Sequence, residues 1–265
     1  MVSLKLVKAV KVTPFLLARF MLVPFREAGK PCLYCPGICI ASCPTFTRSG
    51  NMALSPLGYS RIPDLGRKEC LKCWRCVSEC PLGYELPEKF SEEVELKLEV
   101  LRKGSPMLLS VEGLDVDYGT TMAERLGTGL CVVKGLLRRY DDGCGISRRS
   151  LSRVRREMRK LDKLISLSPE ASHSLKVPFF LEEVQDLPVR LNYRGPVHIP
   201  CLLMDRSEEV VKGLISIGVS PTEVLKDPCI KLDAPKALTL CPRASSLGSL
   251  CFYDLMEFID RTSRA

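Results

Sequence analysis

Short apolar runs alternate with helical spacings along the second half of the chain, and this alternation predicts an α/β arrangement. The apolar runs predict strands at 107–111, 189–192, 197–203, 224–225 and 237–240. Helical spacing predicts helices over 91–101, 148–165, 207–217 and 246–259. We therefore expect small layers of helices on short, parallel sheets in this half.

Residues 31 to about 90 have a different texture, because cysteine, proline and glycine leave room only for short helices. Eight of the fourteen cysteines lie here in two runs, and both runs end in Cys-Pro. The second run has the spacing C-x2-C-x2-C-x3-C, which wraps a chain around a cubane 4Fe–4S cluster. The first run has one extra residue between its second and third cysteines. The cysteines are Cys32, Cys35, Cys39 and Cys43 in the first run and Cys70, Cys73, Cys76 and Cys80 in the second.

In paired runs of this kind the first three thiolates hold one cluster and the fourth cysteine reaches the neighbouring cluster. All-thiolate zinc sites are an alternative, although such sites usually separate their cysteine pairs by a long finger. A disulfide framework is a poorer alternative, because it is typical of small secreted domains. Crossed ligation predicts one cluster on Cys32, Cys35, Cys39 and Cys80, and a second cluster on Cys43, Cys70, Cys73 and Cys76.

Composition adds three limits. The chain has 265 residues, 46% of them apolar, which is enough for one or two domains with real cores. Gln occurs once and Asn twice among many charged residues, a composition typical of thermophiles. The chain has no Rossmann or P-loop glycine motif, so we expect it to bind no flavin, nicotinamide or nucleotide of its own.

Residues 1–30 are apolar and basic, but their longest apolar stretch contains Arg19 and falls well short of the ~20 residues that cross a bilayer. They also lack the small-residue cleavage site of a signal peptide. Two interpretations stay open: the segment packs on the chain's own core, or it docks on a membrane surface or a partner. We expect a cytoplasmic protein. The alternative is a cytoplasmic protein that contacts the inner face of the membrane peripherally.

The net charge of +8 is concentrated between Lys134 and Lys163, where eleven Lys or Arg stand against four acidic residues. A basic surface of this kind can steer an acidic protein, an anionic membrane or nucleic acid toward the molecule. An ordinary solvated surface is the alternative. We expect no nucleic-acid partner, because the aromatic residues that would stack on bases are not interleaved here.

The N-terminal half resembles the iron–sulfur subunits of glycolate oxidase, D-lactate dehydrogenase, anaerobic glycerol-3-phosphate dehydrogenase and heterodisulfide reductase. The resemblance is carried by Cys43-Pro-Thr-Phe46, by Ser55-Pro-Leu-Gly-Tyr-Ser-Arg61-Ile62 between the runs, and by the second run through Cys80-Pro-Leu-Gly83. It implies an α-helical, ferredoxin-like domain with two 4Fe–4S clusters.

The C-terminal half resembles two degenerate CCG repeats, the cysteine-rich α/β units that follow in the same proteins. The second repeat keeps His198-Ile-Pro200-Cys201, Asp227-Pro228-Cys229 and Cys241-Pro242, whereas the first keeps only Cys144 of its doublet. This implies a candidate third metal site, either an ordinary cubane or a zinc ion completed by His198, although idle buried thiols are an alternative. Its residues would be Cys144, Cys201, Cys229 and Cys241.

The predicted fold is α+β overall and has four parts: an N-terminal segment (1–30), a helical ferredoxin-like domain (31–104), and CCG-like repeats at 105–188 and 189–265. The resemblance implies a non-catalytic electron-transfer subunit that relays electrons between a flavin-containing dehydrogenase or reductase subunit and an acceptor such as a quinone or a membrane-associated carrier. Lys72, Trp74 and Arg75 lie between cluster ligands and are candidates for tuning potentials. The alternative is a heterodisulfide or sulfur-metabolism reductase with its chemistry at the C-terminal cysteines. No catalytic residue is assigned.

Overall fold

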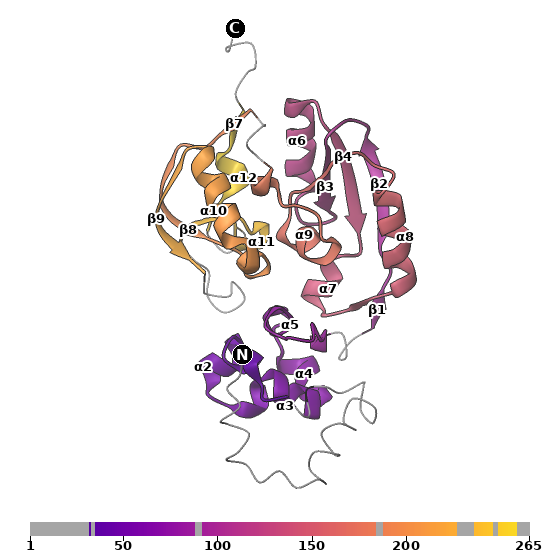
Figure 1. Ribbon diagram of the computed structural model, residues 1–265, viewed down its shortest axis with the longest axis vertical. Helices are drawn as coiled ribbons and strands as arrows, with labels where there is room; N and C mark the ends of the chain where they lie inside the picture. Colours follow the sequence, from indigo (N-terminus) through magenta and orange to yellow (C-terminus); the bar gives the residue numbers. More distant parts are fainter. Residues whose placement is uncertain are drawn as a thin grey trace, which may run out of the picture.

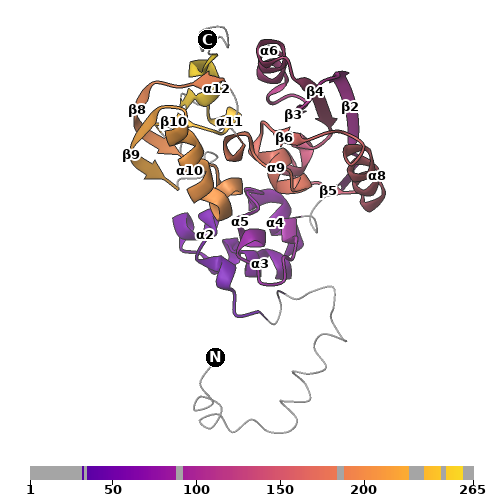
Figure 2. The ribbon, with the colours of Figure 1, turned by 45° about the horizontal axis from the view of Figure 1, so that its top comes forward.

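The computed structural model describes residues 32, 35–87, 92–183, 188–226, 236–245 and 249–258. The predictions for residues 1–30 and for Cys229 lie outside these residues. A helical lobe, drawn in indigo and purple, lies against two α/β lobes that stand side by side (Figures 1 and 2). None of the helices in these ranges is long and apolar enough to span a bilayer.

Prolines begin the helices of the helical lobe. Pro44, Pro56 and Pro63 each occupy the first turn of a helix, where the missing N–H group has no intrahelical partner to lose. Ser55 caps one of these helices, because its hydroxyl accepts a hydrogen bond from the N–H of Gly58 at 3.2 Å. The elements are η2 (Ile38–Ile40), α2 (Pro44–Ser49), η3 (Met52–Leu54), α3 (Pro56–Arg61), α4 (Pro63–Glu69) and α5 (Arg75–Ser78).

The first α/β lobe contains a four-stranded sheet in the order β2-β4-β3-β6. Strands β3 (Met107–Val111), β4 (Gly129–Lys134) and β6 (Leu164–Ser166) are parallel, and β2 (Lys97–Arg102) runs antiparallel to β4 at the edge. A separate parallel pair joins β1 (Glu93–Val94) to β5 (Gly145–Ile146). The helices of this lobe are α6 (Val116–Leu126), α7 (Leu137–Asp141), α8 (Arg148–Met158) and α9 (Pro169–Leu175).

The second α/β lobe has a parallel four-stranded sheet in the order β11-β10-β8-β9. Its strands are β8 (Tyr193–His198), β9 (Val219–Leu225), β10 (Leu238–Thr239) and β11 (Leu250–Cys251). An antiparallel pair joins β7 (Val189–Arg190) to β12 (Glu257–Phe258). The helical elements are η5 (Phe180–Glu182), η7 (Cys201–Arg206), α10 (Ser207–Ser216), α11 (Pro242–Ser245) and α12 (Phe252–Leu255).

The two α/β lobes repeat one strand pattern. In each lobe the first parallel strand, β3 or β8, lies in the centre, with the second strand on one side and the third strand on the other. The predicted architecture of helices with short, mostly parallel sheets is confirmed. One apolar core joins the two lobes, since Leu108 and Ile165 of the first lobe cluster with Val197 and Leu238 of the second.

The structure corrects several predicted elements. Residues 91–101 were predicted as a helix, but β1 and β2 occupy much of this segment. Val94, Leu96 and Leu98 alternate with charged residues, which is a strand period, and pairing with β4 favours the strand over local helix propensity. The segment that closes the predicted helical domain thus joins the first α/β sheet.

Three other predicted elements were also wrong. The basic helix ends at Met158 rather than at 165, because Ile165 belongs to β6 and matches the helical period by coincidence. The strand predicted over 197–203 ends at His198, and Cys201 starts a 3₁₀ helix after Pro200. Within 246–259 the described residues form β11, α12 and β12 instead of one helix. The predicted strand at 107–111 and the helix that starts at Ser207 and stops before Gly218 are confirmed.

Candidate metal centre

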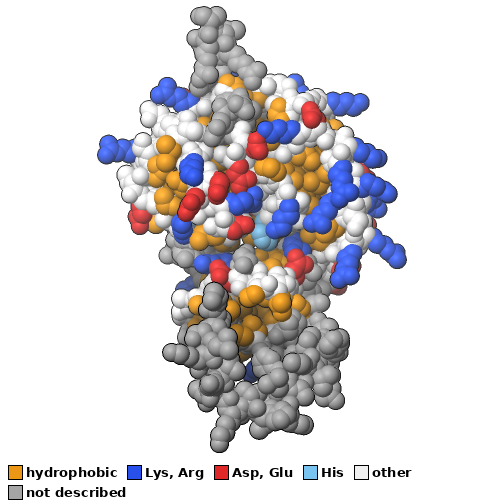
Figure 3. All heavy atoms as spheres, in the orientation of Figure 1, with side chains coloured by type: hydrophobic (Ala, Val, Ile, Leu, Met, Phe, Trp, Pro, Cys, Tyr) orange, Lys and Arg blue, Asp and Glu red, His pale blue; other side chains and the backbone are white. Residues whose placement is uncertain are grey.

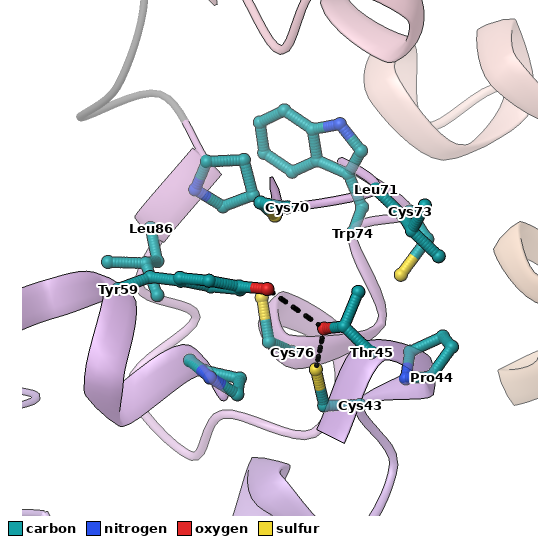
Figure 4. Close-up of a pocket in the computed structure, with 12 residues that line it drawn as sticks. Cys43, Pro44, Thr45, Tyr59, Cys70, Leu71, Cys73, Trp74, Cys76 and Leu86 are labelled. Atoms are coloured by element: carbon teal, nitrogen blue, oxygen red, sulfur yellow. Dashed lines mark hydrogen bonds between the residues drawn. The ribbon is translucent and has the colours of Figure 1, made fainter. Parts of the chain in front are cut away.

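A pocket in the helical lobe is lined by the four cysteines that the crossed-ligand prediction assigns to one cluster. Cys43 stands at the start of α2, Cys70 at the end of α4, Cys73 in the following loop and Cys76 in α5. Figure 4 shows their side chains arranged around one space, with the ring of Trp74 above it and the ring of Tyr59 at its side. The fold therefore brings the last cysteine of the first run to the first three of the second run.

The other four cysteines of the runs are electrostatic neighbours of one another. Burial, followed by the charges of Cys39, Cys80 and Cys35, raises the pKa of Cys32 to about 11. Burial, followed by Cys35 and Cys80, likewise raises the pKa of Cys39 to about 11. Cys80, which ends the second run, thus lies with the first run.

The two cysteine groups adjoin. Burial raises the pKa of Cys76 well above that of an ordinary thiol, and the charges of Cys73, Cys70, Cys39 and Cys43 add to the effect in that order. Cys39 belongs to the other group, so Cys39 and Cys76 mark the place where the groups meet. Thiolates crowded in this way repel one another, and a bound cation or a cluster would relieve that repulsion.

Each run is shaped by a tight turn that directs a backbone N–H group at sulfur. The N–H of Gly37 donates to Cys35 Sγ and the N–H of Lys72 donates to Cys70 Sγ, both at 3.4 Å. Gly37 has a φ of 81° and Lys72 a φ of 54°. The left-handed conformation is unfavourable for a lysine and easy for a glycine. Gly37 and the 3₁₀ turn that follows it accommodate the extra residue of the first run.

A hydrogen-bond network supports Cys43. The Thr45 hydroxyl lies 3.0 Å from Cys43 Sγ, donates to the carbonyl oxygen of Leu54 at 2.9 Å and accepts from the hydroxyl of Tyr59 at 3.1 Å (Figure 4). Tyr59 is buried, and burial is the main cause that raises its pKa to about 12. Thr45 and Tyr59 are not among the residues predicted from the sequence, although both lie in the segments 43–46 and 55–62 that resemble the iron–sulfur subunits.

The donor set fits a four-iron cubane chemically, because each group offers four thiols. Apart from Thr45, the other walls of the pocket are aromatic, aliphatic and proline side chains. Within the described ranges, no three His, Cys, Asp or Glu side chains are close enough together to hold a single metal ion. No disulfide joins any cysteine in those ranges.

In the part of the chain that the structure describes, the cysteines of the candidate third site do not form a group of three that could hold a single metal ion. Cys144 is buried in the apolar core beside β5. Cys201 lies against the helical lobe, where its thiol is 3.9 Å from the carbonyl oxygen of Cys73. Burial, then the charge of Glu170, raises the pKa of Cys241 to about 12. Because Cys229 lies outside the described residues, the third site stays a prediction.

The other residue considered for that site, His198, is buried at the end of β8. Its Nδ1 atom lies 2.9 Å from the hydroxyl of Thr239 on the neighbouring strand β10. His198 is thus hydrogen-bonded within the sheet, at the end of its strand.

The basic surface is narrower than the sequence predicted. Arg139 is only 4% exposed and belongs to the interior, while Lys134 is paired with Glu99 at 2.8 Å. The basic side chains that remain exposed are concentrated on α8 and the turn after it, at the right of Figure 3. We call these residues the α8 basic surface: Arg148, Arg149, Arg153, Arg155, Arg156, Arg159 and Lys160.

Comparisons of the chain with protein-family models, with curated proteins and with solved structures gave no match.

Proposed function

We propose that this chain is an electron-transfer subunit that carries two 4Fe–4S clusters and relays single electrons between a flavin-containing partner and a further acceptor. The observation that carries the proposal is the crossed grouping of the eight cysteines. Cys43 shares a pocket with three cysteines of the second run, and Cys80 acts electrostatically on Cys32 and Cys39 of the first run. This is the arrangement that two adjacent cubanes need.

When bound, a cubane supplies one-electron chemistry at a potential that its surroundings set. This chain's residues supply thiolate ligands, N–H groups directed at sulfur from Gly37 and Lys72, and apolar walls that exclude water. The two cysteine groups are adjacent at Cys39 and Cys76. This supports electron transfer from one cluster to the other rather than two isolated clusters.

The α8 basic surface supports an acidic protein as the partner. It projects several positive side chains from one helix, and only Arg153 among them has a described acidic partner, Glu95 at 3.7 Å. Exposed charges of one sign accelerate encounter with a surface of the opposite sign.

A reductase with its chemistry at the C-terminal cysteines is the weaker candidate. It needs reactive thiolates, whereas Cys241 is held protonated by burial and Cys144 lies in the apolar core.

Metal and sulfide analysis tests the proposal. Anaerobically purified protein should contain about eight irons and about eight sulfides per chain, and dithionite reduction should produce the electron paramagnetic resonance signal of interacting 4Fe–4S clusters. Cys131→Ala serves as a matched control, because Cys131 is buried in β4 outside both groups. Only about four irons, or zinc in place of iron, would overturn the proposal.

A further inference from the structure

The loop that carries three cluster ligands is anchored in the first α/β lobe through Trp74. Trp74 stands between Cys73 and Cys76, is fully buried and adopts a φ of 64°. Its indole N–H donates to the backbone carbonyl oxygen of Arg139 at 3.3 Å. Tyr140 packs edge-on against the indole, with ring centroids 6.1 Å apart. The environment of this pocket therefore includes side chains of α7.

Arg139 places a cation directly over this ligand loop. The carbon of its guanidinium group lies 3.6 Å from the centroid of the Trp74 ring, and its side chain is only 4% exposed. Nη2 donates to Glu85 Oε1 at 2.8 Å. Arginine keeps its charge in proteins, so a permanent positive charge is held in the interior beside the loop.

Water screens the charges of Arg139 and Glu85 to different degrees. The Glu85 side chain is 46% exposed, so water screens its negative charge, whereas the guanidinium lies in a region of low dielectric constant. The buried cation should therefore dominate the local potential at the pocket. Since reduction of a cluster adds one negative charge, a positive potential at the cluster favours the reduced state.

We propose that Arg139 is a positioning residue that raises the reduction potential of the cluster held by Cys43, Cys70, Cys73 and Cys76, and that Glu85 moderates this effect. The inference rests on the proposed function, because it presupposes that the cluster is bound. Trp74 transmits the effect by holding the guanidinium against the ligand loop.

Potentiometric titration followed by electron paramagnetic resonance tests this assignment in the full-length, cluster-loaded protein. The signal that changes in Cys73→Ser identifies the cluster of the second run. Arg139→Gln should lower the potential of that cluster, while Arg139→Lys, which keeps the charge, should stay near the wild-type value. Glu85→Gln should raise the potential. The indole hydrogen bond uses the main chain of Arg139, so these side-chain substitutions leave its acceptor in place.

The outcomes separate charge from packing. Equal shifts in Arg139→Gln and Arg139→Lys, or a shift of Glu85→Gln in the same direction as Arg139→Gln, would overturn the electrostatic role. The other cluster serves as the internal control and should shift less. A wild-type protein that contains no iron would refute the proposed function. A full iron content together with an unchanged reduction potential in Arg139→Gln would refute only this inference.

Discussion

Cys43 offers the sharpest test of how the eight cysteines divide between two clusters. By sequence it ends the first run, but in the fold it lines one pocket with Cys70, Cys73 and Cys76. We expect Cys43→Ala to destroy the cluster of the second run and to spare the cluster of the first. A four-iron cubane accounts for half of the metal, so iron should fall from about eight to about four per chain.

Alkylation under native, anaerobic conditions followed by peptide mass spectrometry identifies which cluster is lost. Cys70 and Cys73 are partly exposed, so they should become reactive in Cys43→Ala. Cys76 is a poor reporter, because burial raises its pKa and keeps the thiol protonated. The ligands of the surviving cluster should stay protected: Cys32, Cys35, Cys39 and Cys80.

The matched variant is Cys80→Ala, which should give the same loss of iron with the reverse pattern of protection. Reactivity that appears at Cys35 in Cys43→Ala, with Cys70 and Cys73 still protected, would refute crossed ligation. The clusters would then be bound run by run.

Two further predictions concern the α/β lobes. Asp115 is buried, its Oδ1 accepts from the N–H of Val111 at 2.6 Å, its Oδ2 has no described partner, and burial raises its pKa to about 8. A carboxyl group whose pKa is raised in the folded state contributes stability that is fully present below pH about 4 and is lost as the pH rises to about 8. This change is on the order of 6 kcal/mol at most. Asp115→Asn should therefore melt at a higher temperature than wild type at pH 9 and at a similar temperature at pH 4.5; a constant difference across this range would contradict the argument. Reversal of Arg149, Arg156 and Lys160 to Glu should slow association with the flavin-containing partner, most at low salt, because screening sets in at a Debye length of ~8 Å in physiological salt. The control reverses Lys103, Arg125 and Lys212, which are exposed outside the α8 basic surface, and an equal slowing in both variants would rule out a docking role.

Sequence alone was most informative where a structural preference is local. The proline after Cys43 and the prolines at 56 and 63 begin helices, because their ring geometry suits the first turn whatever surrounds it. The apolar run at 107–111 forms a strand, and Gly218, with a φ of 104°, follows the helix that starts at Ser207. The prediction of 4Fe–4S clusters also rests on a local property, the spacing of the cysteines and their Cys-Pro ends.

Tertiary structure decided what depends on distant parts of the chain. Residues 97–102 carry charges and leucines that favour a helix in isolation, yet they form a strand because β4 offers an edge with which to pair. Arg139 counted as part of a basic surface until the fold placed it over Trp74, 65 residues away in sequence. Burial of a charge and its packing against a distant aromatic ring arise only when remote segments come together, so no periodicity in the sequence encodes them.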